Sequence, residues 1–132
     1  MEGVTLPENL QQLLARPNPA VIATVRPDGQ PVSVATWYLL EQDRIIVNMD
    51  AGRKRLAYLR QEPRVSLTVL DGEDWYTHVS VTGTVAEIYD DTDMADIDRI
   101  ATHYTGKPYA NRSNGRVTAV IDIKSWHVWP QQ

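Results

Sequence analysis

The residues best suited to chemistry in this 132-residue chain are basic side chains gathered in one short stretch. Five of the thirteen basic residues fall within twelve positions: Arg53, Lys54, Arg55, Arg60 and Arg64. With Glu62 this stretch carries a charge of +4, so the rest of the chain carries −8. Arginine forms bidentate hydrogen bonds with phosphate and carboxylate groups. A local positive patch on an acidic protein therefore indicates a small anionic ligand rather than a polymer.

The other reactive residue types indicate neither a metal site nor a covalent mechanism. The absence of cysteine excludes disulfides, thiolate metal sites and cysteine nucleophiles. His78, His103 and His127 do not have the spacing of metal ligands. The acidic run at 90–93 lacks the glycine and terminal glutamate of a calcium loop, so it predicts the start of a helix. We expect no metal, and the sequence shows no nucleophile or acid–base pair.

Length and charge narrow the classes of function. A chain of this size predicts a single domain over residues 1–132. The net charge of −4 argues against a general nucleic-acid binder or a ligand of acidic membranes. No apolar run approaches the roughly 18 residues of a transmembrane helix, and the acidic N-terminus lacks the core of a signal peptide. These features predict a cytoplasmic protein without membrane or nucleic-acid partners.

Runs of β-branched and apolar residues predict six strands. They cover residues 20–26, 30–40, 44–49, 64–70, 75–88 and 116–129. Turn-forming residues separate the first three, which predicts a meander of hairpins. Gly83 predicts a bulge or tight bend in the fifth strand. A change in the parity of apolar residues predicts a bulge near Lys124 or Ser125 in the last strand.

Three short helices complete the predicted fold. One lies near residues 6–14, a basic one spans 53–61, and an amphipathic one spans 90–104, followed by a loop over 105–115. Many short strands with few helices predict a small closed barrel, because closure removes exposed strand edges. The strand at 20–26 is apolar on both faces, and three short helices cannot cover the outside of a barrel. We therefore expect a second subunit.

Four segments, taken in this order, resemble the pyridoxamine 5′-phosphate oxidase-like split β-barrel family of flavin- and deazaflavin-dependent oxidoreductases. They are AVIATVRPDGQP, GRKRLAYLRQEPRVSLTV, VTGTVAEI and YTGKPY. The resemblance runs from Pro19 to about Trp129. It implies a mainly β fold, a six-stranded split β-barrel with short helices. It also implies a homodimer with the cofactor in the cleft between the subunits.

The resemblance also bears on the choice of cofactor. The FMN-using oxidases of the family hold the FMN phosphate with an Arg and, five residues later, a Lys on the second strand. Aligned on Gln30-Pro31, these positions hold Val34 and Leu39 here. Two charge-assisted contacts, each worth roughly 1.5–3 kcal/mol, are therefore missing. This departure argues against FMN bound in that manner and leaves FMN as the alternative cofactor.

The branch of the family that uses the deazaflavin coenzyme F420 has Arg-x-Lys at the start of a basic helix, followed by Asp-Pro-Arg. The segment 53–55 matches with Arg55 in place of the Lys, Arg60 continues the basic helix, and Glu62-Pro63-Arg64 matches the end. The tail of F420 carries a phosphodiester and glutamates. Arg53, Lys54, Arg55 and Arg60 at and after a helix N-terminus suit such a polyanion. The resemblance therefore implies coenzyme F420.

Further positions follow from the same resemblance. Thr36 and Trp37 on the second strand, with Asn48 and Met49 before the basic helix, are expected to border the deazaflavin ring. His78 falls where the FMN oxidases place a Gln near the cofactor. The C-terminal Arg-x-His that holds pyridoxal in the oxidases is represented only by His127, so oxidation of pyridoxamine phosphate is not expected.

The function implied is an F420H2-dependent reductase that transfers a hydride from the reduced deazaflavin to a conjugated organic substrate. Tyr109 and Lys107, in the loop after the last helix, are expected at the mouth of the cleft, with Tyr109 the candidate proton donor. The alternatives are an FMN-dependent oxidoreductase of the same fold and a non-catalytic protein that binds F420 or haem. DNA binding through the basic helix is a further alternative. A DNA affinity that falls steeply with salt concentration would indicate it.

Overall fold

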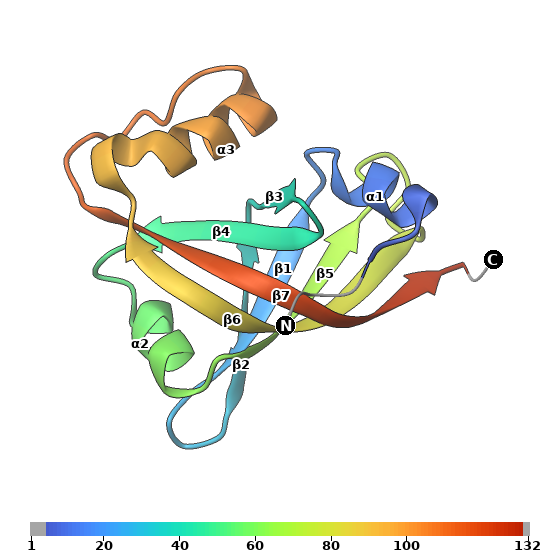
Figure 1. The fold of residues 1–132 in the computed structure, drawn as a ribbon, viewed down its shortest axis with the longest axis horizontal. Helices are drawn as coiled ribbons and strands as arrows, with labels where there is room; N and C mark the ends of the chain where they lie inside the picture. Colours follow the sequence, from blue (N-terminus) through green and yellow to red (C-terminus); the bar gives the residue numbers. More distant parts are fainter. Residues whose placement is uncertain (1–4, 131–132) are drawn as a thin grey trace.

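The structure, a computed structural model, describes residues 5–130 (Figure 1). Strands dominate, and three α-helices and one 3₁₀ turn connect them. In chain order the elements are α1 (Glu8–Leu14), β1 (Ala20–Val25), β2 (Pro31–Thr36), β3 (Leu39–Glu41), β4 (Arg44–Asp50), α2 (Lys54–Gln61), β5 (Arg64–Leu70), β6 (His78–Asp90), the 3₁₀ turn η1 (Thr92–Met94), α3 (Ala95–Thr105) and β7 (Arg116–Trp129).

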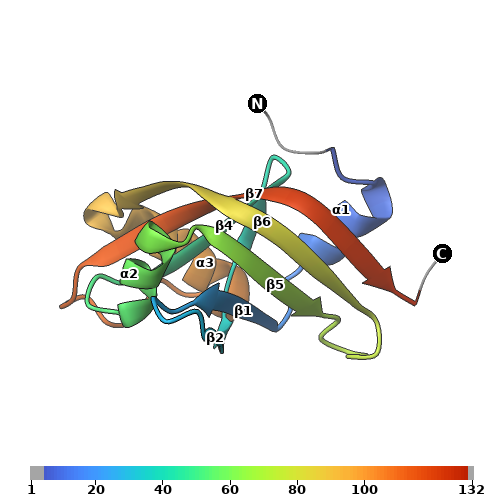
Figure 2. The ribbon, with the colours of Figure 1, turned by 90° about the horizontal axis from the view of Figure 1, so that it is seen from below.

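The strands form one antiparallel sheet in the order β2-β1-β5-β6-β7-β4-β3. The sheet curls on itself, so that α2 and α3 lie at one end and α1 at the other (Figures 1 and 2). The two outermost strands, β2 and β3, follow each other in sequence, yet residues 5–130 contain no ladder between them. The barrel is therefore split, as the resemblance implied, and not closed by a continuous ladder.

The sheet has seven strands where the sequence predicted six, because the predicted strand over 30–40 is divided into β2 and β3. The break falls at Trp37 and Tyr38, which leave the ladder. Tyr38 turns into the core, where it is 1% exposed. Its hydroxyl donates a hydrogen bond to the Leu14 carbonyl at 2.8 Å. Burial of the Tyr38 side chain therefore interrupts the segment 30–40, which the sequence predicted as one continuous strand.

The predicted bulges in the two longest strands are confirmed. Thr82 pairs with Ser125 and Gly83 pairs with Ile123, so Lys124 is left without a partner in β6. A Cβ atom at Gly83 would overlap the carbonyl oxygen of Asp122. Only glycine permits this close approach of the two backbones. A second register shift, between Val85 and Glu87, was not predicted.

Two predicted boundaries are wrong for local reasons. The strand predicted over 75–88 runs instead from His78 to Asp90, because residues 71–77 form turns closed by hydrogen bonds such as Asp71 N–H to the Thr77 carbonyl. The helix predicted over 90–104 begins only at Ala95. Asp90 still belongs to β6, and Asp93 and Met94 adopt positive φ before the helix starts.

Apolar side chains fill the interior of the curled sheet. α1 closes one end with its leucines, and Leu10 and Leu14 are at most 2% exposed. α3 packs Ile97 and Ile100 against Ile46 of β4 in a smaller cluster. These two helices therefore fix the ends of β3 and β4, and β4 leads directly into the basic segment.

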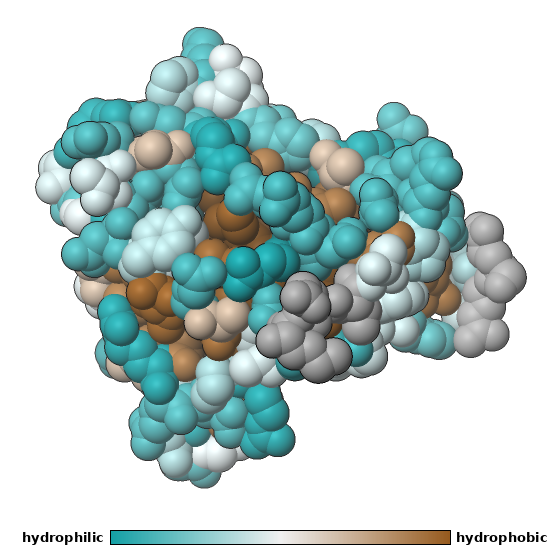
Figure 3. Space-filling model, viewed as in Figure 1, coloured by the Kyte–Doolittle hydropathy of each residue, from teal (hydrophilic) through white to brown (hydrophobic). Residues whose placement is uncertain are grey.

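Part of the apolar surface stays uncovered. The edge strand β2 is exposed or half-buried along its whole length, and Val34 on it is 43% exposed. Val21 on β1 is 37% exposed, so the first strand is not buried on both faces within one chain. Figure 3 shows apolar residues grouped in the middle of one face among hydrophilic ones. None of the described helices has the length and apolar character needed to cross a membrane.

Candidate active site

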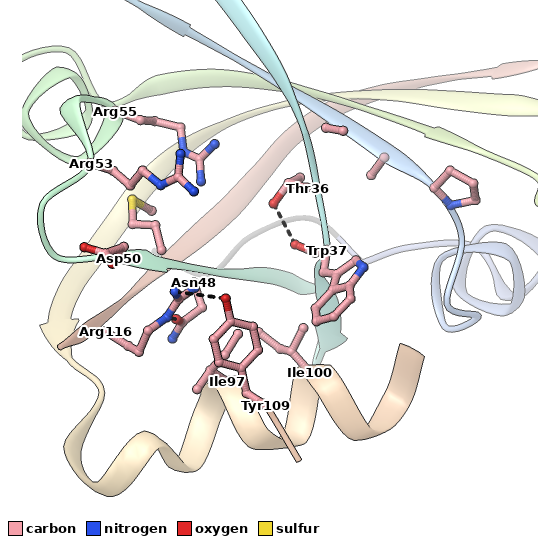
Figure 4. A pocket seen from close by; sticks show the side chains of 14 residues that line it. Thr36, Trp37, Asn48, Asp50, Arg53, Arg55, Ile97, Ile100, Tyr109 and Arg116 are labelled. Atoms are coloured by element: carbon pink, nitrogen blue, oxygen red, sulfur yellow. Dashed lines mark hydrogen bonds between the residues drawn. The ribbon is translucent and has the colours of Figure 1, made fainter. Parts of the chain in front are cut away.

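A pocket of about 370 Å³ lies where the end of β2, the end of β4 and the N-terminus of α2 face α3 (Figure 4). It has a basic side, contributed by α2 and the start of β7, and an apolar side, contributed by Trp37 and α3. The lining residues are Pro19, Ala20, Ala35, Thr36, Trp37, Asn48, Met49, Asp50, Arg53, Arg55, Ile97, Ile100, Tyr109 and Arg116.

The basic side begins at the N-terminus of α2. Arg53 is the N-cap residue, and no side chain caps the helix, so its first N–H groups are open to an anion. Arg55 is half-buried, and its Nε atom is buried with no hydrogen-bond partner. Burial, followed by the nearby charges of Arg53 and Arg116, lowers the pKa of the Arg55 guanidinium. A bound anion would offset the repulsion between these guanidinium groups.

Arg116, at the start of β7, is a third guanidinium in the pocket, and sequence reasoning missed it. Its Nε–H donates to Asn48 Oδ1 at 2.9 Å, and its Nη1 lies 3.4 Å from the Tyr109 hydroxyl. Its guanidinium carbon also lies 4.7 Å from the centre of the Tyr109 ring, which places a cation over an aromatic face. Within residues 5–130, no carboxylate lies within ion-pair distance of Arg53, Arg55 or Arg116.

Asp50 is the acidic residue of the pocket, and it stands opposite Arg116 in the β4–β7 register. Its carboxylate accepts a hydrogen bond from the Gly52 N–H at 2.8 Å. That backbone contact, and to a lesser degree the charges of Arg116 and Arg53, keep the pKa of Asp50 below its usual value. One carboxylate among three guanidiniums leaves the pocket positive.

Asn48 lies beneath this basic side and is only 8% exposed. Its amide nitrogen donates to Asp91 Oδ2 and to Thr118 Oγ1, both at 3.0 Å. Asp91 in turn accepts the backbone N–H groups of Asp96 and Ile97, each at 2.8 Å, and so caps α3. The same buried contacts therefore fix β4 and the first turn of α3.

Aromatic and aliphatic side chains form the apolar side. Trp37 stacks on Tyr104 with ring centres 5.2 Å apart, and Tyr109 meets Trp37 edge to face at 6.4 Å. The loop that carries Tyr109 is held by α3, because the Tyr109 N–H donates to Asp98 Oδ1 at 3.0 Å. Trp37 and Tyr109, with Ile97 and Ile100, form a wall of the pocket suited to a flat conjugated molecule.

The structure brings seven of the residues singled out from sequence into this one pocket: Thr36, Trp37, Asn48, Met49, Arg53, Arg55 and Tyr109. Four others lie outside its lining. Lys54, Arg60 and Lys107 are exposed, the first two on α2 and the last in the loop after α3. His78 starts β6, opposite Leu70 and Trp129, with Nδ1 2.9 Å from the Tyr76 carbonyl. Residues 5–130 hold no cluster of His, Asp and Glu suited to a metal.

Of the pocket residues that sequence reasoning missed, Arg116 left a readable signal. It is the one charge at the head of a strand that is otherwise uncharged up to Asp122. Asp50 also stands at the end of an apolar strand, and antiparallel pairing of two such strands could have predicted their meeting. Ile97 and Ile100 belong to the predicted amphipathic helix, and nothing in their spacing indicates that α3 lines a pocket.

Comparison with known proteins identifies relatives of this chain. The family model of pyridoxamine 5′-phosphate oxidase matches residues 6–130. A solved F420 reductase is similar over 92% of this chain and 98% of its own, with 28% identity and a TM-score of 0.83. A conserved hypothetical protein from Mycobacterium tuberculosis is 27% identical over 97% of this chain and 86% of its own, with a TM-score of 0.71.

More distant structures share the fold alone. A putative pyridoxamine 5′-phosphate oxidase from Listeria innocua is 13% identical over 94% of this chain and 98% of its own, with a TM-score of 0.71. No curated protein matches the sequence.

Proposed function

This chain belongs to the pyridoxamine 5′-phosphate oxidase family, and from that premise we propose that it is a homodimeric reductase dependent on coenzyme F420. The family and the similarity to an F420 reductase support an oxidoreductase with a flavin or deazaflavin cofactor. The proposed reaction is hydride transfer from the reduced deazaflavin to an electrophilic double bond of a conjugated organic substrate.

The observation that carries the proposal is the unpaired guanidinium group of Arg55. A buried donor without a partner costs roughly 1–3 kcal/mol, and more when the group is charged. Arg53 stands beside it at an uncapped helix N-terminus. This arrangement is unfavourable in the free protein and favourable once a phosphate or carboxylate binds. The residues present therefore fit the anionic tail of the coenzyme.

The apolar side of the same pocket suits the ring system. Trp37 and Tyr109 offer rings for stacking, and Ile97 and Ile100 exclude water from the reacting atoms. When bound, the reduced coenzyme supplies the hydride from its C5 position. Tyr109 is the proposed proton donor, because it lines the pocket and its hydroxyl lies 3.4 Å from Arg116 Nη1.

The size of the pocket indicates where the remainder of the coenzyme lies. About 370 Å³ is near the lower limit for small-molecule sites, so the pocket holds part of a long coenzyme. Lys54 and Arg60, both exposed on α2, would meet a tail that leaves the pocket. His78 lies outside the pocket, so it would reach a cofactor only at the site of a second subunit. The exposed edge strand β2 and the exposed Val21 and Val34 support such a subunit.

FMN is less well supported as the cofactor. The positions where the FMN oxidases carry their phosphate-binding Arg and Lys hold Val34, on β2, and Leu39, on β3. Neither side chain can contact a phosphate through a charge. An FMN enzyme would therefore have to place the phosphate at Arg53 and Arg55.

The test is a fluorescence titration of the purified protein with F420 and, in parallel, with FMN. We expect saturable F420 binding at micromolar or lower concentration and weaker FMN binding. Arg53→Ala and Arg55→Ala should each raise the Kd for F420 at least tenfold, which corresponds to about 1.4 kcal/mol. Unchanged affinity in both variants would refute the assignment of the anion site.

Arg44→Ala serves as the control, because Arg44 is ion-paired with Asp122 and Glu87 outside the pocket. It removes the same charge and should leave the Kd unchanged. Turnover with F420H2 and a panel of enones and quinones then separates an enzyme from a carrier. Tight binding without turnover would indicate a non-catalytic binding protein, and a Soret band on haem addition would indicate a haem protein.

A further inference from the structure

Arg116 is the least expected of the three guanidiniums in the pocket, because it comes from β7 and not from the basic segment of the sequence. It is half-buried, and its Nε–H is taken by Asn48. Figure 4 shows its guanidinium beside Asn48 and Tyr109, across Asp50 from Arg53 and Arg55, and all three arginines line the pocket. The edge formed by the two terminal nitrogens of a guanidinium is the one that binds an anion with two hydrogen bonds.

The direction of Arg116 is set by the orientation of the Asn48 amide. The Asn48 nitrogen has two acceptors, Asp91 Oδ2 and Thr118 Oγ1, and the Asn48 oxygen accepts from Arg116. Rotating the amide by 180° would place a donor against Arg116 and an acceptor against the Asp91 carboxylate. Only one orientation satisfies all three contacts, so the amide presents its oxygen to Arg116.

Asp91 in turn holds that amide in place. It is 7% exposed, and its two carboxylate oxygens accept from the Asp96 N–H, the Ile97 N–H and Asn48. Thr118 completes the group, since its hydroxyl accepts from Asn48 and donates to Asp96 Oδ2 at 2.8 Å. Every polar atom in the group has a partner, which makes it a rigid support.

We propose that Arg116 is a third anion-binding residue of the pocket, and that Asn48 and Asp91 are positioning residues that aim it at the ligand. The ligand class is a phosphate or carboxylate group attached to a flat conjugated molecule. The inference rests on the proposed function in that the F420 tail supplies such a group. The same assignment would hold for the phosphate of FMN.

A double-mutant cycle tests the proposal with the full-length protein. Arg116→Gln should raise the Kd for F420 at least tenfold, and Asn48→Ala should raise it several-fold. Combining the two should weaken binding no further than Arg116→Gln alone, because Asn48 acts through Arg116. Effects that multiply in the double variant, or an unchanged Kd in Arg116→Gln, would overturn the proposal.

Two further variants distinguish the loss of an anion contact from a general disturbance of the fold. Arg116→Lys keeps the charge but loses the Nε–H that Asn48 orients, so its Kd should lie between those of the wild type and Arg116→Gln. Arg44→Gln removes an ion-paired arginine elsewhere and should leave the Kd unchanged. Asn48→Ala retains the contacts between Asp91 and α3, so we expect it to fold even if Asp91→Asn does not.

Inorganic pyrophosphate separates this inference from the proposed function. Millimolar pyrophosphate should raise the thermal unfolding temperature of the wild type and have little effect on Arg116→Gln. If the wild type binds pyrophosphate through Arg116 but not F420, the proposed function fails and the inference stands. If F420 binds while Arg116→Gln responds to both ligands as the wild type does, the inference fails and the proposed function stands.

Discussion

Replacement of Arg55 by methionine should stabilise the free protein and weaken its ligand binding. Methionine keeps the unbranched aliphatic stem and has a similar helix propensity, so packing and the backbone of α2 change little. The guanidinium, with its unpartnered Nε, is removed. Nearby Arg53 and Arg116 then lose one like-charged neighbour, whose presence contributes to the lowered pKa of Arg55.

The expected gain follows from the cost of a buried, unpartnered donor. That cost is roughly 1–3 kcal/mol, and partial exposure of the side chain places the expected value at about 1–2 kcal/mol. For a domain of this size, 1 kcal/mol shifts the midpoint of thermal unfolding by about 3–6 °C. Differential scanning calorimetry without ligand should therefore show a Tm for Arg55→Met about 3–12 °C above the wild type.

Binding should move in the opposite direction. F420 at a hundred times its Kd stabilises the wild type by about 2.7 kcal/mol, and a tenfold loss of affinity removes about 1.4 kcal/mol of that. Arg44→Met is the matched control: it breaks contacts with Asp122 and Glu87, so it should lower the Tm and spare the affinity. A lower Tm for ligand-free Arg55→Met would refute the argument, because Arg55 would then stabilise the fold without an anion.

Three other substitutions test separate parts of the structure. Gly83→Ala should destabilise the protein by about 2–4 kcal/mol in urea unfolding, because its Cβ would overlap the Asp122 carbonyl. A free energy of unfolding within about 0.5 kcal/mol of the wild type, the range of ordinary surface substitutions, would contradict the bulge geometry. Trp37→Ala should raise the Kd for F420 about tenfold, because it removes an aromatic ring that stacks on the deazaflavin ring. Stacking of an aromatic side chain on a base is worth roughly 1–3 kcal/mol, and Trp37→Phe should therefore retain most of the affinity. Asp96 has a pKa held below its usual value: burial opposes this shift, but hydrogen bonds from Arg99, Tyr89 and Thr118 outweigh it. Its ionised carboxylate therefore stabilises the fold at pH values above the pKa of Asp96 in the unfolded chain. This stabilisation is lost as the pH falls through the pKa of Asp96 in the folded protein. In urea unfolding at a series of pH values, Asp96→Asn should therefore show a smaller loss of unfolding free energy towards acid pH than the wild type.

Periodicity and turn chemistry predicted most of the fold because they are local. The bulge at Lys124 could be foreseen, since an extra residue reverses which side chains face the core. The division of the strand over 30–40 could not be foreseen. It depends on a tertiary contact, the burial of Tyr38 against α1, that no local pattern records. The late start of α3 has a similar cause, because Asp91 caps the helix with its side chain from four residues before it.

The site was predictable where its residues lie close together in sequence. Arg53 and Arg55 share a helix N-terminus, and Thr36 and Trp37 share a strand end, so motif and charge locate them. Arg116 enters from a strand more than sixty positions away. Its role depends on the β4–β7 register and on the orientation of one amide. A sequence pattern shows neither the strand register nor the orientation of an amide. The resemblance to the family did not include Arg116 either.

The distribution of charge favours a small ligand over a polymer at the proposed site. At physiological ionic strength, charges separated by more than about 8 Å of solvent are largely screened. A small ligand in the pocket therefore interacts chiefly with Arg53, Arg55 and Arg116, and little with the acidic remainder of the surface. A nucleic acid laid across the same patch would also cover surface that carries the remaining negative charge. The acidic remainder thus opposes polymers while changing the affinity for a compact anion little. Arg53, Arg55 and Arg116, which have no carboxylate at ion-pair distance among residues 5–130, would supply that affinity.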